Sequence, residues 1–415
     1  RPPLLISNSS WYLIHYRKLL ISELKNIYSQ VVTLSPIDKS SSDLSKISLF
    51  IPWHINRSKS YNVLSLSKSL IKLTFLIRAI KPGFIHSHTL LSNLLVAFVG
   101  SIFSIPTVLS FPGLGKLKAQ KGINNWILIF ILKIIVLLSF YSRISKLKFR
   151  YSTKRSIFIF QNNVDLQFFK SRFKKIPTSN LKLIYGSGVP TDYLKKKIYN
   201  QKNNWLSNEK KKKVKPNFIY CARLLESKGI LTFVEIAKLL PDYKFLVFGD
   251  IDPSSEDSLT LAQVNMISKS SKNITFYKNK KDPLKNLKVD FPILIVPSNY
   301  GEGFPRGVAE AIVLNYPVII SSKASCQIFD KNDVYIANKD DPKSYLESFE
   351  KILEDFNKGI ISPKLENSRE KVIKNFSEKI VVNKTLKLYQ ALLMSNKSTY
   401  FDRKNSINPI NWIAP

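Results

Sequence analysis

The sequence predicts an α/β protein built from two parallel-sheet domains, and three observations lead to this prediction. The chain has 415 residues, which is long for a single hydrophobic core. Short apolar runs alternate with stretches of helical periodicity in both halves, the pattern of parallel strands joined by crossover helices. A lysine-rich stretch separates the halves, as is typical of a solvated linker. We therefore expect a first domain over residues 1–190, a basic linker over 191–215 and a second domain over 216–375.

The composition is strongly basic, with 64 Lys and Arg against 29 Asp and Glu and a formal net charge of +35. Such a surface favours nucleic acid, anionic lipid headgroups or phosphorylated substrates. Compositional drift toward Lys, Asn, Ile and Ser is the alternative explanation. The two cysteines, Cys221 and Cys326, imply no disulfide framework and indicate a reducing compartment. Four histidines without a Cys/His cluster argue against a structural zinc site.

The first domain opens with a β-α-β pattern: a strand over residues 2–7, helical periodicity over 12–24 and a strand over 31–35. The sequence opens on an apolar strand rather than a signal peptide. We expect a cytoplasmic protein. The loop at Asn8, Ser9 and Ser10 lacks the G-x-G-x-x-G of a dinucleotide fingerprint. A helix over 60–81 leads to a strand over 84–88, where His86 and His88 share one face. This pair lacks a third metal ligand, and it either lines a cleft at the strand end or lies hydrogen-bonded in the core.

The most apolar segment, residues 126–140, predicts a helix with apolar residues on every side. Its length of about 22 Å is short of the ~30 Å hydrocarbon core of a bilayer. Lys133 lies in its middle and basic residues flank it on both sides. We expect this helix to dip into a membrane surface, with its flanks on lipid phosphates. A buried crossover helix is the alternative, and a spanning helix is the least favoured.

The second domain places two basic residues at the end of its first strand, residues 217–222. Arg223 follows that strand directly, at the edge where open parallel sheets bind ligands. Lys228 comes just before the next helix. Together they can clamp a diphosphate, Arg by a forked contact and Lys as a point charge. A second strand ends at Gly249, and the loop there is also expected to border the ligand.

The most informative stretch runs from residue 298 to 321 and predicts a strand end, a glycine-bearing loop, a helix and another strand. Gly301 and Gly303 permit a tight turn and a close approach of ligand to backbone. Glu302 lies in the loop and Glu310 about two turns into the helix, whose N-terminus suits an anion. A nucleotide sugar carries phosphates in its middle and hydroxyls at both ends. It therefore suits an anion site with a hydrogen-bonding carboxylate on either side. An ordinary strand–loop–helix with both carboxylates solvated is the alternative.

This stretch, E-G-F-P-R-G-V-A-E-A followed by P-V-I, resembles the acidic signature of the glycosyltransferase group 1 family, the retaining enzymes of family 4. R-L-L-E-S-K-G at 223–229 resembles the R-L-x-x-x-K-G pyrophosphate pair of the same family. The resemblance implies the GT-B fold, two Rossmann-like domains facing each other across a cleft. It implies catalytic roles for Glu302 beside the donor sugar and for Arg223 and Lys228 on the diphosphate. The donor contacts it implies are Glu310 on the ribose, Gly303, Phe304, Pro305, Gly249, Ser187 and Gly188.

Two further stretches resemble the lipid-linked-glycan branch of the family. H-S-H-T at 86–89 matches its H-x-H-T, and Pro112-Gly113-Leu114-Gly115 matches its T-G-L-G or H-G-x-G loop. This implies acceptor or cleft contacts by His88, Gly113 and Gly115. Pro112 replaces the branch's usual Thr or His, so the loop contributes through its backbone. In the G-S-G-V-P sequence at 186–190, Pro190 replaces the usual Asp.

The resemblance as a whole implies retaining transfer of a hexosyl or N-acetylhexosaminyl group from a nucleotide-diphosphate sugar, with a UDP-sugar favoured. The implied acceptor is a polyprenyl-diphosphate-linked glycan of cell-surface polysaccharide or lipopolysaccharide synthesis, at the inner face of the membrane. We expect no metal ion or other cofactor and no specific nucleic acid. A helix over 376–394 is expected to cross back to the first domain, before a tail over 395–415. The rival classes are a nucleic-acid- or polyanion-binding protein and a non-catalytic protein that binds sugar nucleotides.

Overall fold

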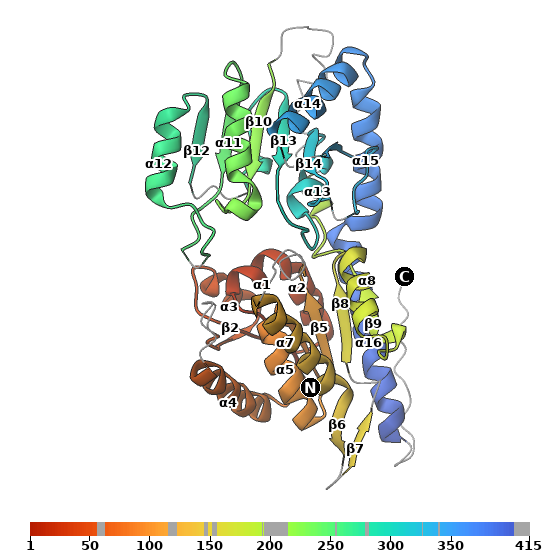
Figure 1. Ribbon diagram of the computed structural model, residues 1–415. Coiled ribbons are helices and arrows are strands. Elements are labelled where there is room, and N and C mark those ends of the chain that lie inside the picture. Colours follow the sequence, from red (N-terminus) through yellow and green to blue (C-terminus); the bar gives the residue numbers. More distant parts are fainter. Residues whose placement is uncertain are drawn as a thin grey trace.

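The computed structural model shows two α/β domains stacked one on the other, joined at one side by a long C-terminal helix (Figure 1). It describes residues 1–55, 63–114, 123–144, 148–151, 156–192, 194, 215–253, 255–278, 282–325, 327–338 and 341–401. Most of the predicted linker and the end of the predicted tail lie outside these ranges.

The first domain is built on a seven-stranded parallel sheet in the order β3-β2-β1-β4-β5-β8-β9. Its five inner strands are buried throughout, as expected of a parallel sheet covered on both faces, whereas the edge strands β3 and β9 are partly exposed. A separate antiparallel hairpin, Tyr141–Ile144 (β6) with Lys148–Tyr151 (β7), projects from this domain. The sheet strands are β1 Pro3–Ile6, β2 Val32–Ser35, β3 Leu49–Pro52, β4 Phe84–His88, β5 Thr107–Phe111, β8 Ser156–Phe160 and β9 Leu181–Leu183.

Helices cover both faces of this sheet because successive side chains of each strand point to opposite sides. Leu4 and Ile6 pack with α4 (Val63–Ile80), α5 (Leu90–Phe103), α7 (Ile123–Phe140) and α8 (Asn163–Arg172). Leu5 packs with α1 (Ser10–Tyr16), α2 (Lys18–Ile27), α3 (Ser41–Ile47) and α16 (Glu378–Phe401). A 3-10 turn, η1 (Thr178–Asn180), precedes β9.

The single helix predicted over 12–24 is two helices, because the chain breaks at Arg17. The backbone of Arg17 leaves helical geometry, at φ −131° and ψ 7°. Its guanidinium, nearly buried, donates to the carbonyl of Gly186 at 3.3 Å and to the hydroxyl of Tyr12 at 3.3 Å. A tertiary contact with a residue 169 positions away therefore sets the break, and helical periodicity alone does not reveal it.

The second domain holds a six-stranded parallel sheet in the order β12-β11-β10-β13-β14-β15. Its strands are β10 Asn217–Cys221, β11 Lys244–Phe248, β12 Ile274–Tyr277, β13 Pro292–Val296, β14 Val318–Ser321 and β15 Tyr335–Ala337. Its helices are α11 Ile230–Leu239, α12 Leu261–Ser270, α13 Arg306–Val313, α14 Pro342–Asn357 and α15 Ile361–Phe376, with 3-10 turns η2 Glu226–Lys228 and η3 Leu284–Asn286. The two sheets establish the predicted α/β class with two Rossmann-like domains.

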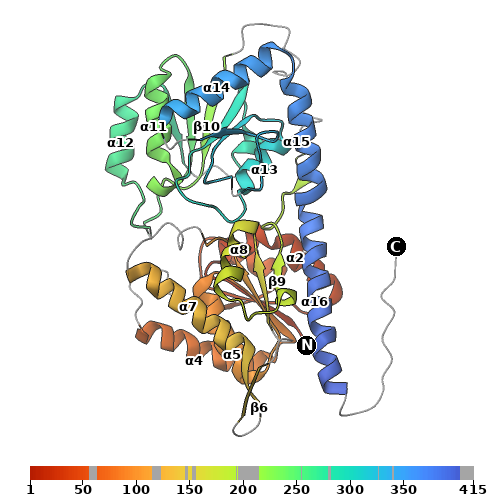
Figure 2. The ribbon, with the colours of Figure 1, turned by 45° about the vertical axis from the view of Figure 1, so that its right-hand side comes forward.

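Helix α16 connects the two domains. It begins where α15 of the second domain ends and packs on α2 of the first, as Figure 2 shows at the right of the molecule. Its Tyr389 is buried, and the hydroxyl lies 2.5 Å from Nδ1 of His86 on β4. The C-terminal helix thus returns to the core of the first domain.

Candidate active site

A cavity of about 990 Å³ lies between the two domains, and its two walls differ in chemistry. The second-domain wall carries charged side chains from the loops after β10, β11 and β13. The first-domain wall is largely aromatic and aliphatic. The principal charged residues of the cavity are Arg223, Lys228, Asp250, Asp252, Glu302 and Arg306, and the principal apolar ones are Trp11, Tyr12, Leu90, Leu91, Leu128 and Ile131.

Lys228 is positioned by a close crossing of two loops. Gly229, which caps η2 and opens α11, has φ +76°, the left-handed region that favours glycine. A Cβ atom at Gly229 would lie 1.9 Å from the carbonyl oxygen of Pro297. The backbone N–H of Asn299 donates to the carbonyl of Ser227 at 3.0 Å. These contacts hold Lys228 beside the loop that follows β13.

Lys228 and Glu302 form an ion pair across this crossing, with Nζ 2.7 Å from Oε1. Their side chains are only 15% and 17% exposed, so water screens the pair weakly. Burial by itself would lower the pKa of Lys228, but the charge of and hydrogen bonds to the Glu302 carboxylate and the Tyr300 hydroxyl hold it above its ordinary 10.5. Lys228 therefore stays protonated and offers a fixed positive charge in the cavity.

Arg223 is held differently, at the cavity rim. Its Nη1 lies 2.6 Å from Oδ2 of Asp252, and its side chain is 54% exposed. Arg223 and Lys228 both line the cavity, but each is paired with a carboxylate rather than converging on one point. A diphosphate clamp by these two residues requires exchange of these partners.

Glu310 lies about one turn into α13, not two as predicted, and pairs with Arg306, whose Nε is 2.8 Å from its Oε1. Arg306 also donates to the carbonyl of His15 at 2.9 Å and to Oγ of Ser187 at 3.1 Å. Its guanidinium lies 5.1 Å from the ring centroid of Tyr16. Arg306, which lines the cavity, thus connects the acidic signature to the first domain. Arg306 is not among the site residues predicted from the sequence, although its place between the two glutamates was a usable signal.

Gly303, in the loop between β13 and α13 that we call the signature loop, and Gly113 of the first domain lie at a contact between the domains. A Cβ at Gly303 would lie 1.7 Å from the carbonyl oxygen of Pro112, and one at Gly113 would lie 3.0 Å from the Gly303 nitrogen. Nδ2 of Asn162 donates to the carbonyls of Glu302 and Gly303, each at 2.9 Å. The sequence predicts that a ligand approaches the backbone closely at Gly303. In the structure, the backbone of the first domain makes that close approach.

The other predicted donor contacts are divided. Gly249, Phe304 and Pro305 line the cavity. Ser187 reaches it through its hydrogen bond to Arg306. Gly188 packs on the start of α16, where an added Cβ would lie 2.5 Å from Cα of Glu378. The lack of a side chain at Gly188 therefore allows the chain to pass close by as it returns to the first domain.

The resemblance implies that His88 contacts donor or acceptor, but the structure buries it completely. Its ring lies 5.2 Å from that of Tyr12, which lines the cavity, and 4.1 Å from that of His86. Burial, followed by the positive potential of His86 and Arg17, holds the pKa of His88 well below its ordinary 6.5. His88 thus supports the cavity wall from behind Tyr12. Gly115 lies outside the described residues, as does Cys326.

Among the described residues, no three His, Cys, Asp or Glu side chains are grouped so that they could hold a metal ion. Within the same ranges, no helix is both long and apolar enough to cross a bilayer.

Residues 201–378 match the family model described as glycosyl transferases group 1. The second domain is therefore similar to the group 1 glycosyltransferases. A curated relative of this glycosyltransferase from Escherichia coli, a UDP-Gal:alpha-D-GlcNAc-diphosphoundecaprenol alpha-1,3-galactosyltransferase, is 24% identical over 338 residues, 78% of this chain and 79% of that one.

Solved structures share its fold. A glycosyltransferase from Rickettsia africae superposes with a TM-score of 0.70 at 18% identity, covering 95% of this chain and 99% of that one. Anabaena Alr3699/HepE in complex with UDP superposes at 0.69 and 13% identity, covering 94% and 100%. These likenesses confirm the predicted GT-B architecture of the glycosyltransferase.

Proposed function

We propose that this glycosyltransferase moves a hexosyl or N-acetylhexosaminyl group from a UDP-sugar to a sugar carried on a polyprenyl diphosphate, with retention of anomeric configuration. The observation that carries the proposal is the cavity between the domains, which is lined by Arg223 and Lys228 from the loop after β10 and by Glu302 from the loop after β13. The names of the Escherichia coli relative and of the UDP-bound Anabaena structure support the choice of donor and acceptor.

The polar wall suits the leaving diphosphate. As the bond to the sugar breaks, negative charge grows on the departing phosphate, and positive groups already fixed in place stabilise it. Lys228 supplies a buried charge and Arg223 a forked donor. Because Arg223 is exposed, exchange of its Asp252 partner for phosphate costs little. The proposal assigns the charge neutralisation to these side chains rather than to a metal ion.

The two glutamates would hold the two ends of the donor. Glu302, oriented by Lys228, would accept hydrogen bonds from hydroxyls of the sugar. Glu310, oriented by Arg306, would accept them from the ribose. Each carboxylate is only 17% exposed and already carries a cation partner, so its geometry is fixed before the donor arrives.

The apolar wall suits a lipid-linked acceptor. Leu90 and Leu91 at the start of α5, and Leu128 and Ile131 of α7, line the cavity opposite the charged loops. Trp11 adds an aromatic face that is 47% exposed. A wholly hydrophilic acceptor would gain nothing from four aliphatic side chains, whereas a sugar on an isoprenoid chain would.

The test is incubation of the protein with UDP-galactose, UDP-glucose or the two UDP-N-acetylhexosamines and a GlcNAc-diphosphopolyprenol, followed by NMR of the product. We expect one donor to give a new glycosidic bond with the donor's own anomeric configuration. An inverted linkage would overturn the retaining assignment, and transfer from none of the UDP-sugars would overturn the choice of donor.

A further inference from the structure

Helices α4, α5 and α7 form the outer layer on one face of the first domain, and their outward side is apolar. They lie side by side, α5 between the other two (Figures 1 and 2). Six large apolar side chains of these helices are between 48% and 70% exposed: Ile71, Phe75, Ile102, Trp126, Phe130 and Leu137. We call these six residues the three-helix face. A soluble surface rarely gathers so many exposed apolar groups without a partner.

The charges on the same helices are all of one sign. The sequences of α4, α5 and α7 contain no Asp or Glu, and they carry exposed Lys68, Lys72, Arg78 and Lys133. By contrast, α14 of the second domain carries both lysines and carboxylates. The cations of these helices are thus not offset by any carboxylate on the same helices, although their net charge per residue is no greater than that of the whole chain.

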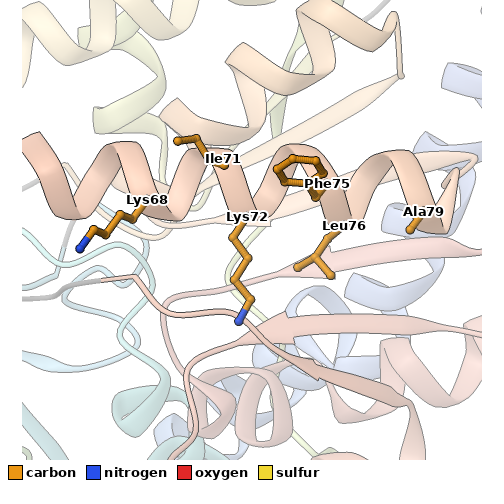
Figure 3. A pocket seen from close by; sticks show the side chains of 6 residues that line it. All are labelled: Lys68, Ile71, Lys72, Phe75, Leu76 and Ala79. Atoms are coloured by element: carbon orange, nitrogen blue, oxygen red, sulfur yellow. The ribbon is translucent and has the colours of Figure 1, made fainter.

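The outer side of α4 shows the arrangement most clearly (Figure 3). Ile71 and Phe75 lie one turn apart, and the side chains of Lys68 and Lys72 extend below the helix in this view. These residues line a shallow hollow of about 510 Å³ together with Leu76 and Ala79. On α7, the rings of Trp126 and Phe130 stack with centroids 5.5 Å apart. Apolar bodies next to flexible cations are the pattern of a helix that lies in the interfacial region of a bilayer.

We propose that the three-helix face docks this protein on an anionic lipid bilayer. Aliphatic and aromatic groups would enter the boundary between headgroups and acyl chains, while the lysines and Arg78 would contact lipid phosphates. A protein partner or a second copy of the chain would need acidic groups opposite these cations, and these three helices offer none to a copy of themselves. The sequence predicts membrane contact for residues 126–140 alone, and the structure extends the surface to α4 and α5.

The position of α7 links this surface to the cavity. Leu128 and Ile131 of α7 line the cavity, whereas Trp126 and Phe130 of the same helix are exposed outside it. A lipid-linked acceptor anchored in the bilayer would therefore reach the apolar wall of the cavity along α7. This last step rests on the proposed function, whereas the docking itself does not.

The experiment is flotation of the full chain with vesicles of phosphatidylcholine alone and of phosphatidylcholine mixed with phosphatidylglycerol. Surface lysines attract anionic lipid, so we expect at least ~10-fold tighter binding to the mixed vesicles, weakened by added salt. Ile71→Glu/Phe75→Glu should lower binding to the mixed vesicles at least ~10-fold, because it places carboxylates where apolar groups enter the interface. Lys68→Glu/Lys72→Glu should remove the preference for the anionic lipid.

The matched control is Met266→Glu on α12, an equally exposed apolar residue of the second domain, 66% exposed, which should bind as the wild type does. Thermal stabilisation by UDP-sugars reports on the donor site. If UDP-sugars did not stabilise the protein, the proposed function would be in question but the docking on membranes would not. Equal vesicle binding by wild type and Ile71→Glu/Phe75→Glu would overturn the proposal. The proposal would also be overturned if the wild type bound no vesicles and instead formed a dimer, seen by sedimentation equilibrium, that Ile71→Glu/Phe75→Glu dissociates.

Discussion

Nζ of Lys228 lies 2.7 Å from Oε1 of Glu302, although 74 residues separate them in the sequence. This pair joins the loop after β10 to the loop after β13, at the end of neighbouring strands in the sheet. It places one positive and one negative group where a sugar diphosphate presents its phosphates and hydroxyls. The reaction that we propose depends on this juxtaposition.

Glu302→Ala should abolish transfer while leaving nucleotide binding intact. The carboxylate would orient the sugar, and loss of one preorganised polar group at a reacting centre costs about 10²-fold or more in turnover. Lys228, released from its partner, remains available for phosphate, so the affinity for UDP should be unchanged or higher. Turnover assays and calorimetric titration with UDP measure the two effects. Glu354→Ala, which removes an exposed carboxylate paired with Lys358 on α14, is the control and should keep full activity. Loss of UDP binding in Glu302→Ala would contradict the assigned role.

Arg306→Ala should destabilise the fold and weaken donor binding together. It removes the ion pair with Glu310 and the hydrogen bonds to His15 and Ser187. Hydrogen bonds to charged groups are each worth roughly 1.5–3 kcal/mol, so we expect a loss of about 2 kcal/mol after partial compensation by water. Urea unfolding of Arg306→Ala, Glu310→Ala and the double variant gives the coupling energy. Strictly additive losses would show that the pair is not coupled.

Gly303→Ala should separate the signature loop from the first domain. Its Cβ would lie 1.7 Å from the carbonyl oxygen of Pro112, so the loop must move and lose the hydrogen bonds from Asn162. We expect turnover to fall and the midpoint of urea unfolding to drop. Gly307→Ala is the matched control for stability, because a Cβ there meets nothing within 4 Å. At this helical position alanine should be neutral or stabilising by about 0.5–1 kcal/mol. Equal midpoints for the two variants would contradict the packing argument.

The buried histidines should make the protein less stable in mild acid. Burial, followed by the charge of Arg17, holds the pKa of His86 well below its ordinary 6.5, and the pKa of His88 is lowered in the same direction. Below about pH 6.5 the unfolded chain therefore binds protons that the folded chain does not. Stability is fully present above that pH and falls below it, by up to ~1.4 kcal/mol per pH unit for each imidazole.

His88→Gln tests this prediction, because it removes one titrating group while keeping a polar side chain of similar size. Urea unfolding between pH 7.5 and 5.5 gives the free energy of unfolding as a function of pH. The slope of that dependence should be smaller in His88→Gln than in the wild type, by an amount that corresponds to up to one proton. The same slope in both proteins would show that His88 takes up protons equally in the folded and unfolded states.

The sequence predicts the fold well because its signals are local. Apolar runs and helical periodicity locate both sheets, and Gly301 and Gly303 predict the turn that carries Glu302, ahead of the helix that carries Glu310. The sequence also predicts that Lys228 lies near the donor. It does not predict that Lys228 pairs with Glu302 or Arg223 with Asp252, because these contacts depend on how separate loops cross.

Contacts between the domains are harder still to predict. Gly303 and Gly188 are glycines because backbone from distant parts of the chain approaches them, Pro112 in one case and Glu378 in the other. His88 is the last residue of β4, yet Tyr12 lies next to it and lines the cavity in its place. A single sequence carries no signal for which of two neighbouring side chains reaches the surface.

The most direct test of the donor site is calorimetric titration of the wild type and of Lys228→Ala with UDP. Removal of the buried cation takes away a charge-assisted contact with the diphosphate, so we predict that the wild type binds UDP and that Lys228→Ala binds it at least ~10-fold more weakly. Undiminished affinity in Lys228→Ala, or no binding of UDP by the wild type, would contradict the assignment of the cavity as the donor site.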